Sequence, residues 1–350
     1  MCIQCYKRCW YILYYRVWTN IQGLRSTSHA MARDLKERLT CSAFSTASGE
    51  QLFGTAPIWE RCICVEVPLP WNQNLFLSNF FQDHLLTDYL TQCTQKIPGL
   101  RILGIVNNNE EPTRGIRVLA FDKSGGNPGK SSYLFPKDSF KETLSTLIRE
   151  PDCSLLKPYA ENSEGIRDYV VCTHGNRDVC CGFWGYQLYK ELCDNYATEK
   201  VRFWRASHIG GHKFAPTLLS LDDARYWGRV EARDFARIIN REFDVEDINA
   251  MYRGKATCRS AQEQLIEKEL LNRFGWDLDA QQVSIRLLGS HGCKSEYTVA
   301  ISAARDPDAI VIEYVFVIEE NVTGLTYGCT ARPTFNSGKR YSIVGASRFD

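Results

Sequence analysis

Two short motifs rich in cysteine and histidine constrain this chain more than any other feature. The first is CTHGNRDVCCG, from Cys172 to Gly182, and the second is SHIGGHKFAP, from Ser207 to Pro216. Each motif begins where an apolar run ends, and such a run predicts a strand. Two thiolates and two imidazoles that converge on one centre suit few metals. The sequence therefore predicts a metal centre, either a [2Fe-2S] cluster or zinc.

The order strand, helix, strand, strand, helix occurs twice along the chain. The first set has strands at residues 58–67, 100–106 and 116–121, and helices at 79–95 and 138–149. The second has strands at 168–172, at 201–206 and around Leu218 and Trp227, and helices at 185–197 and 231–241. This order predicts an α/β protein with two tandem thioredoxin-like units (β-α-β-β-α), in residues 31–155 and 156–250.

The remaining residues, 251–350, predict a helix followed by a β extension. Residues 260–274 have the apolar spacing of an amphipathic helix, with Gly275 as its stop. Strands are expected at 283–288, 297–303 and 310–318, and the last is apolar enough to be buried on both faces. His291 and Cys293 cannot close a four-ligand site alone, so we expect a structural loop there.

Composition excludes several classes of protein. The formal net charge is +1 over 350 residues, and no block of Lys and Arg occurs, so nucleic acid is not a predicted partner. The 15 cysteines are odd in number and scattered, which is typical of a reducing compartment and predicts a cytoplasmic protein.

The first 30 residues differ from the rest. They lack Asp and Glu and hold an aromatic run from Trp10 to Trp18 that is too short to span a membrane and is interrupted by Arg16. We interpret residues 1–30 as an extension upstream of a natural start at Met31. This extension is either not native or disordered. A membrane-surface or targeting segment is the alternative.

The two motifs together are similar to the signature of the sucrase/ferredoxin-like family. Members of that family are thioredoxin-like ferredoxins with one [2Fe-2S] cluster. The resemblance extends from Cys41-Ser-Ala-Phe-Ser through Tyr226-Trp-Gly-Arg to Tyr252-Arg-Gly. It implies four cluster ligands: Cys172, Cys181, His208 and His212. The unit at 156–250 would then hold the cluster, and the unit at 31–155 would hold none. The implied function is electron transfer between an unknown redox protein donor and acceptor, rather than catalysis.

Replacing two thiolates by neutral imidazoles makes an added electron easier to accept, because the oxidised site then carries no net charge. Rieske centres, with two histidines, reach about −150 to +300 mV, against about −400 mV for plant-type ferredoxins. We therefore expect a raised potential. It should also depend on pH, because each imidazole keeps a second nitrogen that can protonate.

Spacing alone leaves Cys180 and His174 open as ligands, and only the resemblance selects Cys181. Helix amides near Cys181 and Gly182 are expected to favour thiolate and to donate to the cluster. A thiol-disulfide enzyme or sensor using Cys172 with Cys180 or Cys181 is one alternative function, and a structural zinc site is another.

Other residues receive simpler predictions. Gly210 and Gly211 predict a tight loop between the two histidines rather than a helix. Asp178 and Arg177 are interpreted as loop-fixing residues or a surface ion pair, and Lys213 as a residue that steers an acidic partner or is solvated. Cys41 is predicted to be structural, because no histidine or second cysteine is near it in the sequence. Cys62 and Cys64 are predicted to lie in the core. Residues 124–131 are predicted to form a flexible loop.

Overall fold

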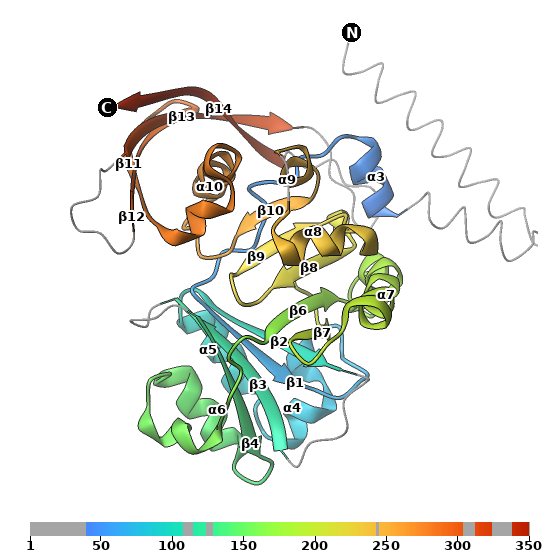
Figure 1. Cartoon of the computed structure of the whole chain (residues 1–350). Helices are drawn as coiled ribbons and strands as arrows, with labels where there is room; N and C mark the ends of the chain where they lie inside the picture. Colours follow the sequence, from blue (N-terminus) through green and yellow to red (C-terminus); the bar gives the residue numbers. More distant parts are fainter. Residues whose placement is uncertain are drawn as a thin grey trace, which may run out of the picture.

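The computed structural model describes residues 40–107, 115–123, 129–242, 245–303, 312–323 and 338–349. It confirms the mixed α/β class, with one ten-stranded sheet, one four-stranded sheet and several helices (Figure 1). The predictions for residues 1–30 and for most of the glycine-rich loop, 124–128, lie outside the described residues. In the part of the chain that is described, no helix is long and apolar enough to cross a membrane.

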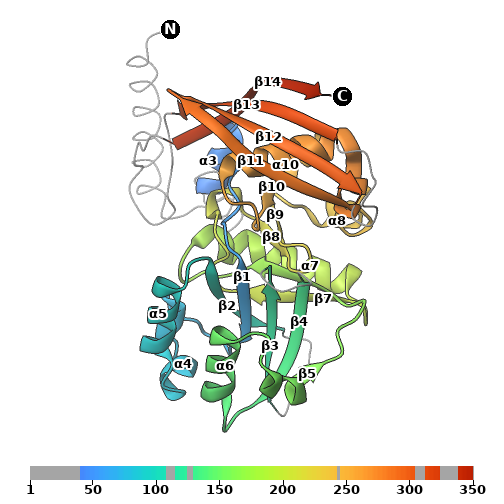
Figure 2. The same ribbon diagram turned by 90° about the vertical axis from the view of Figure 1, so that its left-hand side faces the viewer.

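The first half of the large sheet comes from the amino-terminal part of the chain. Its strands are β1 (Arg61–Glu66), β2 (Leu100–Val106), β3 (Gly115–Asp122), β4 (Gly129–Pro136) and the short β5 (Ala160–Glu161). Its helices are α3 (Cys41–Ala47), α4 (Asn79–Asp83), α5 (Thr87–Lys96) and α6 (Phe140–Arg149). Figure 2 shows α4, α5 and α6 against the strands β1 to β4.

The second half of the sheet follows directly. Its strands are β6 (Arg167–Cys172), β7 (Val201–Ala206), β8 (Thr217–Ser220), β9 (Arg225–Gly228) and β10 (Tyr252–Lys255). Its helices are α7 (Tyr186–Tyr196), α8 (Phe235–Asn240) and α9 (Val245–Met251).

The two halves repeat one strand order. The full order is β10-β9-β8-β6-β7-β2-β1-β3-β4-β5. In each half the first strand is parallel to the second and antiparallel to the third, so β1 and β6 occupy equivalent places. The halves meet where β2 and β7 run antiparallel, with Ile105 opposite Ala206 and Val106 opposite Arg205.

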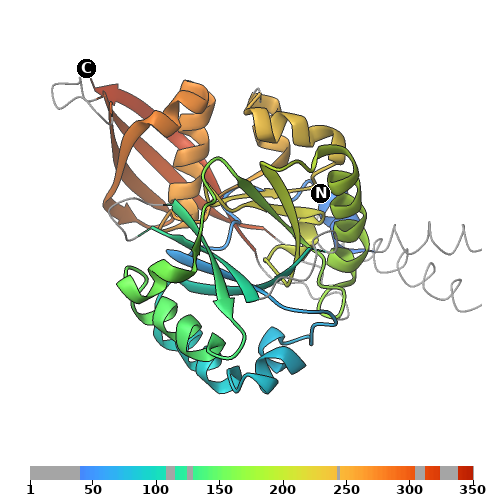
Figure 3. The same cartoon turned by 60° about the horizontal axis from the view of Figure 1, so that its bottom comes forward.

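The inner faces of the two halves share one core. Alternate residues of each strand point to opposite faces, so Ile63 and Val65 pack under α4 to α6, whereas Cys62 and Cys64 face inward. The inward group also contains residues of the second half, including Val170, Trp204 and Tyr226. Trp59 Nε1 donates to Tyr226 Oη across this core at 3.0 Å. Figure 3 shows α4 to α6, coloured cyan to green, and α7 on the outside of the strands.

A buried ion cluster also joins the halves. Asp168 on β6 is fully buried and pairs with Lys130 on β4. Arg202 donates to both carboxylate oxygens, at 2.8 and 3.0 Å, and Trp204 Nε1 donates at 2.7 Å. Burial raises the pKa of Asp168, but the hydrogen bond from Arg202 and the charge of Lys130 outweigh it and hold this pKa below its usual value.

The carboxyl-terminal part forms a separate small sheet on one helix. Helix α10 (Ala261–Phe274) begins at the N-cap Ser260 and ends at Gly275, as predicted. The sheet order is β11 (Gln281–His291), β12 (Lys294–Ala303), β13 (Ile312–Thr323) and β14 (Gly338–Phe349). The predicted burial of residues 310–318 on both faces is wrong: Phe316 and Ile318 are buried, but Val315 and Val317 are only half-buried, because one sheet face alone packs on α10. His291 and Cys293 lie at the β11–β12 turn.

Several predicted elements differ from the observed ones. The single helix at 79–95 is two helices, because Leu85 adopts a left-handed conformation (φ 53°) between them. The last three residues of the loop predicted over 124–131 belong instead to the unpredicted strand β4. The helix at 231–241 is a 3₁₀ turn, Ala232–Asp234, followed by the shorter α8. Elements α9, β10 and β14 were also not predicted.

Candidate metal centre

The two motifs lie side by side because the strands that precede them are parallel neighbours. Cys172, the last residue of β6, is in register with Ala206, the last residue of β7. The amide of Thr173 donates to the Ala206 carbonyl at 3.0 Å. Since parallel strands end at one edge of a sheet, both loops leave from the same corner.

Three of the four predicted ligands converge at this corner. Cys172, Cys181 and His208 each offer a donor atom within 4.8 Å of the others, and they form the only such group found among the described residues. Both cysteines are buried, and His208 is half-buried. His212 lies outside this group, although its ring centroid is 6.1 Å from that of His208. We name Cys172, Cys181 and His208 the donor group.

The segment carrying Cys181 is closed tightly against the end of β6. The chain passes through one π-helical turn, Cys181–Gly185, before α7. A Cβ atom on Gly185 would lie 1.8 Å from the Cys172 carbonyl oxygen, and one on Gly182 would lie 2.6 Å from the Gly175 Cα. Only glycine fits these two places. The amide of Gly182 donates to the Asp178 carbonyl at 3.1 Å, which holds the two ends of this loop together.

The three side chains of the donor group shift one another's pKa values. Burial raises the pKa of the Cys172 thiol, but hydrogen bonds from Cys181 and His208 overcome this and lower it well below the usual value. The hydrogen bond to Cys172, together with burial, raises the pKa of Cys181. Burial lowers the pKa of His208, yet Asp178 and Cys172 raise it to about 9. The lowered pKa of Cys172 favours its thiolate, which is the form of cysteine that binds metals.

Asp178 faces both histidines rather than forming a surface pair with Arg177. Its Oδ2 is 3.0 Å from His208 Nδ1, and its Oδ1 is 3.5 Å from His212 Nδ1. Even so, His208 Nδ1 is a buried atom without a hydrogen bond of acceptable geometry among the described residues. An imidazole with a carboxylate on one side and two buried thiols close by fits the donor set of a metal centre, in which a ligating histidine commonly also contacts a carboxylate.

Two arginines hold the loop that carries the histidines. Gly210 and Gly211 have φ values of 95° and 79°, which confirms the predicted loop. Arg253, on β10, donates to the Gly210 carbonyl at 2.9 Å, and Arg101 donates to the His208 carbonyl at 3.0 Å. Burial lowers the pKa of Arg253 to about 10. Sequence reasoning assigned neither arginine a role, because each lies more than 40 residues from its partner.

The first half of the sheet supports the first motif. His174 Nε2 lies 2.9 Å from the Asn72 carbonyl oxygen, and His174 Nδ1 accepts from the His208 amide at 3.2 Å. Asn176 donates to the Trp71 carbonyl at 2.7 Å. Burial lowers the pKa of His174. His174 therefore connects the two loops through hydrogen bonds at both ring nitrogens.

A second pair of thiols lies beside the donor group. Cys180 Sγ is 3.2 Å from Cys41 Sγ, and Cys41 Sγ is 3.0 Å from His212 Nδ1. Cys41 was predicted to have no histidine or second cysteine near it in the sequence, and its two partners are indeed 139 and 171 residues away along the chain. Lys213 pairs with Glu50, so the prediction of a solvated side chain is wrong, and the prediction that it steers an acidic partner stays a prediction.

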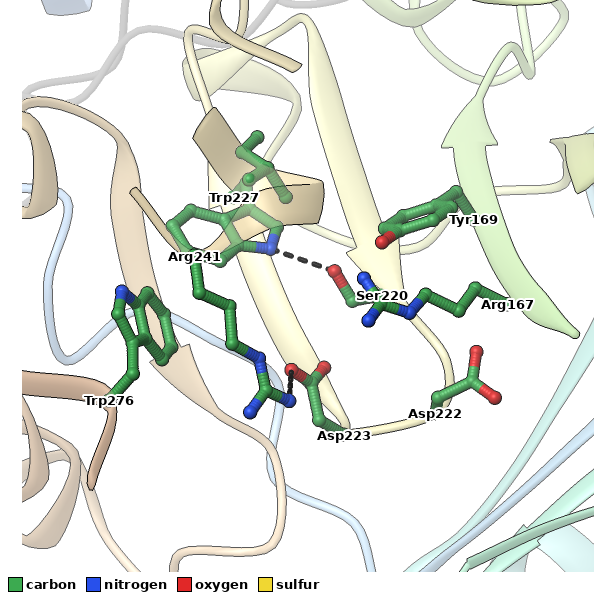
Figure 4. A pocket seen from close by; sticks show the side chains of 9 residues that line it. Arg167, Tyr169, Ser220, Asp222, Asp223, Trp227, Arg241 and Trp276 are labelled. Carbon is green, nitrogen blue, oxygen red and sulfur yellow. Dashed lines mark hydrogen bonds and ion pairs between the residues drawn. The ribbon is translucent and has the colours of Figure 1, made fainter. Parts of the chain in front are cut away.

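A separate polar cavity of about 90 Å³ opens near the other end of β6. Figure 4 shows Arg167, Tyr169 and Asp222 on its rim, with Trp276 opposite. Trp227 Nε1 donates to Ser220 Oγ at 3.0 Å, and Arg241 lies 3.9 Å from Asp223. Arg167 begins the strand that Cys172 ends, so this cavity is distinct from the donor group.

Comparisons with known proteins support the resemblance found in the sequence. The family described as sucrase/ferredoxin-like matches residues 52–254, a span that includes all four predicted ligands. The chain is also 26% identical over 121 residues to "Altered inheritance of mitochondria protein 32" from Meyerozyma guilliermondii, covering 31% of this chain. The matched part spans 42% of that relative's own length. No solved structure matches the chain.

Proposed function

Because the chain belongs to the sucrase/ferredoxin-like family, we propose that it holds one [2Fe-2S] cluster and transfers single electrons. Cys172, Cys181, His208 and His212 are the proposed ligands. The convergence of the donor group within 4.8 Å at one buried corner carries the proposal. His212 completes the set as the imidazole at the far end of the same loop.

We also infer that the two halves of the large sheet are tandem thioredoxin-like units. Each half runs strand, helix, strand, strand, strand, with the second, first, third and fourth strands adjacent in that order. The loop after the first strand of such a unit meets the start of the following helix, and that is where Cys172 and Cys181 lie. Under this inference only the second unit carries a cluster.

The chain's own residues set the properties of the site. A bound cluster would supply reversible one-electron chemistry. Two thiolates and two neutral imidazoles leave an oxidised centre without net charge, so the potential lies above that of an all-cysteine ferredoxin. Asp178 orients the imidazoles through their Nδ1 atoms, and Arg253 places a buried positive charge at the histidine loop. A second imidazole nitrogen that can protonate makes the potential fall with rising pH.

A thiol-disulfide function for Cys172 and Cys181 is the second candidate. The hydrogen bond between them and the lowered pKa of Cys172 favour it, because the thiolate is the nucleophile in disulfide exchange. Both side chains are buried, at 0% and 1% exposed, which withholds them from a protein disulfide substrate. The cluster proposal fits this burial better.

The test is anaerobic purification followed by iron and sulfide analysis, visible spectra and reduced-state EPR. We expect two irons and two sulfides per chain, and a potential that falls in the His208→Cys and His212→Cys variants, because each adds a thiolate charge. Cys180→Ala is the matched control: it neighbours Cys181 in the sequence, lies outside the donor group and should keep both the cluster and its spectrum. A colourless protein with stoichiometric zinc, or with no metal after reconstitution, would refute the proposal.

A further inference from the structure

Cys41 and Cys180 form a second, separate pair of thiols. Their sulfurs are 3.2 Å apart, and both side chains are fully buried. They pack with Ala215 and the half-buried Trp184 in a small apolar cluster of their own. Neither belongs to the donor group. The two residues lie 139 positions apart in the sequence, so a bond between them would join distant segments.

Helix α3 brings Cys41 to this place and is itself anchored there. The Ser42 hydroxyl donates to the Ala215 carbonyl, and Arg229 donates to Ser45 Oγ at 3.0 Å. Cys180 is fixed from the other side, because the next residue, Cys181, enters the tight π turn. With both backbones held, the sulfurs must approach by only about 1.2 Å to reach the S–S bond length of about 2.0 Å.

We propose that Cys41 and Cys180 are a redox-active dithiol that closes to a disulfide and ties helix α3 to the cysteine loop. Because both thiols are buried, the oxidant must be small, and we name hydrogen peroxide as its class. One thiolate attacks the peroxide, which breaks the O–O bond and leaves a sulfenic acid and hydroxide. The second thiol displaces water from the sulfenic acid to form the S–S bond. Two thiols and one peroxide thus give one disulfide and two waters.

Closing the disulfide also changes what His212 contacts. In the dithiol form Cys41 Sγ lies 3.0 Å from His212 Nδ1. In the disulfide form this sulfur has no hydrogen to donate and is held toward Cys180. The disulfide itself does not depend on the proposed cluster. Its effect on His212 as a ligand does rest on the proposed function.

The experiment maps cysteine pairing in the full chain before and after treatment with an excess of hydrogen peroxide. Tryptic cleavage places Cys41 alone in residues 39–61, and Cys180 with Cys181 in residues 178–190. After oxidation we expect these peptides to be linked, with the loss of two hydrogens, and dithiothreitol to separate them. The link should disappear in Cys180→Ala and persist in Cys181→Ala, which also removes a proposed cluster ligand.

Two results would overturn the proposal. One is no link between these peptides when the exposed Cys293 in the same sample is fully oxidised. The other is a link that survives in Cys180→Ala, because Cys41 would then couple to Cys181. Cys62 and Cys64 serve as the internal control: their sulfurs are 4.0 Å apart, but they are neighbours along one face of a strand and should stay reduced. A link that forms in Cys181→Ala without any metal would support the dithiol even if the cluster proposal failed.

Discussion

The two halves of the large sheet have the same strand order, but they present different chemical groups at equivalent corners. In the second half, the first strand ends at Cys172 and leads into the donor group. In the first half, the equivalent strand β1 ends at Glu66 and leads into a loop containing Trp71 and Asn72. This loop offers backbone carbonyls, which contact Asn176 and His174 of the other corner.

This difference teaches that the strand order supplies a corner, while the side chains decide its use. The corner of the second half holds the donor group, and the corner of the first half supports a loop of that group. The comparison also shows what the first half contributes: its loop is part of the scaffold of the other half. Changes at equivalent positions should therefore have very different effects.

The largest effect is expected from changing the last residue of each first strand. Cys172→Ser removes a proposed ligand and should abolish bound iron and visible absorbance. Glu66→Gln is at the equivalent place in the first half, where its carboxylate accepts from the Arg117 amide at 3.3 Å, and should retain the cluster. Metal analysis of both purified variants tests this. Equal iron in the two variants would contradict the assignment of the corners.

The next effect concerns the ion cluster between the halves. Asp168→Asn leaves Lys130 and Arg202 without their buried anion and should cost about 3–5 kcal/mol of unfolding free energy at neutral pH. The folded pKa of Asp168 is depressed, so its stabilisation is complete above the usual value of 3.8 and is lost as pH falls through the folded pKa. Urea unfolding of both proteins at several pH values should therefore show a difference that shrinks toward acid.

Asp122→Asn provides the control for this prediction. Asp122 pairs with Arg61 at 2.6 Å within the first half, and both side chains are about one-fifth exposed. A partly exposed pair should contribute only about 1 kcal/mol or less. If both substitutions cost the same, the charge between the halves is no more important than a pair within one half.

The smallest effect is expected where the two corners touch. Asn176→Ala removes one hydrogen bond to the Trp71 carbonyl and should cost about 1 kcal/mol. Cluster loss to a chelator should then be up to ~5-fold faster, because the loop opens more often. Asn162→Ala, in an exposed turn away from the site, is the control. Bleaching of the visible band measures both rates, and identical rates would remove the supporting role of the first half.

Strands in the middle of the sheet were predictable because most of their residues are apolar and buried. The observed bounds of β2 and β7 match the predicted 100–106 and 201–206. Strand β4 begins with Gly129, Lys130 and Ser131, which do not have the apolar pattern of a strand. This segment is a strand because it pairs with β3, and the local sequence does not predict that pairing. The break at Leu85 is equally invisible, since leucine itself favours a helix.

The candidate site likewise contains some residues that the sequence predicts and others that only the fold brings together. Cys172, Cys181 and His208 belong to contiguous motifs, so sequence reasoning found them. Cys41 and Arg253 reach the site only through the fold, from elements far along the chain. Backbone carbonyls of the first half have no sequence signature at all. The motifs and the family resemblance together thus predict the candidate donors, whereas tertiary packing decides which residues hold them in place.

The inner core shared by the two halves limits how far this chain can be shortened. A fragment beginning at β6 would keep every proposed ligand. It would also expose Val170, Trp204 and Tyr226, which the inward faces of β1 to β3 now cover. It would also lose Trp59, which donates to Tyr226, and Lys130, one of the two cations that pair with Asp168. The half that carries the donors is therefore not a detachable module, and shortening the chain to it should yield an aggregating protein rather than a minimal ferredoxin.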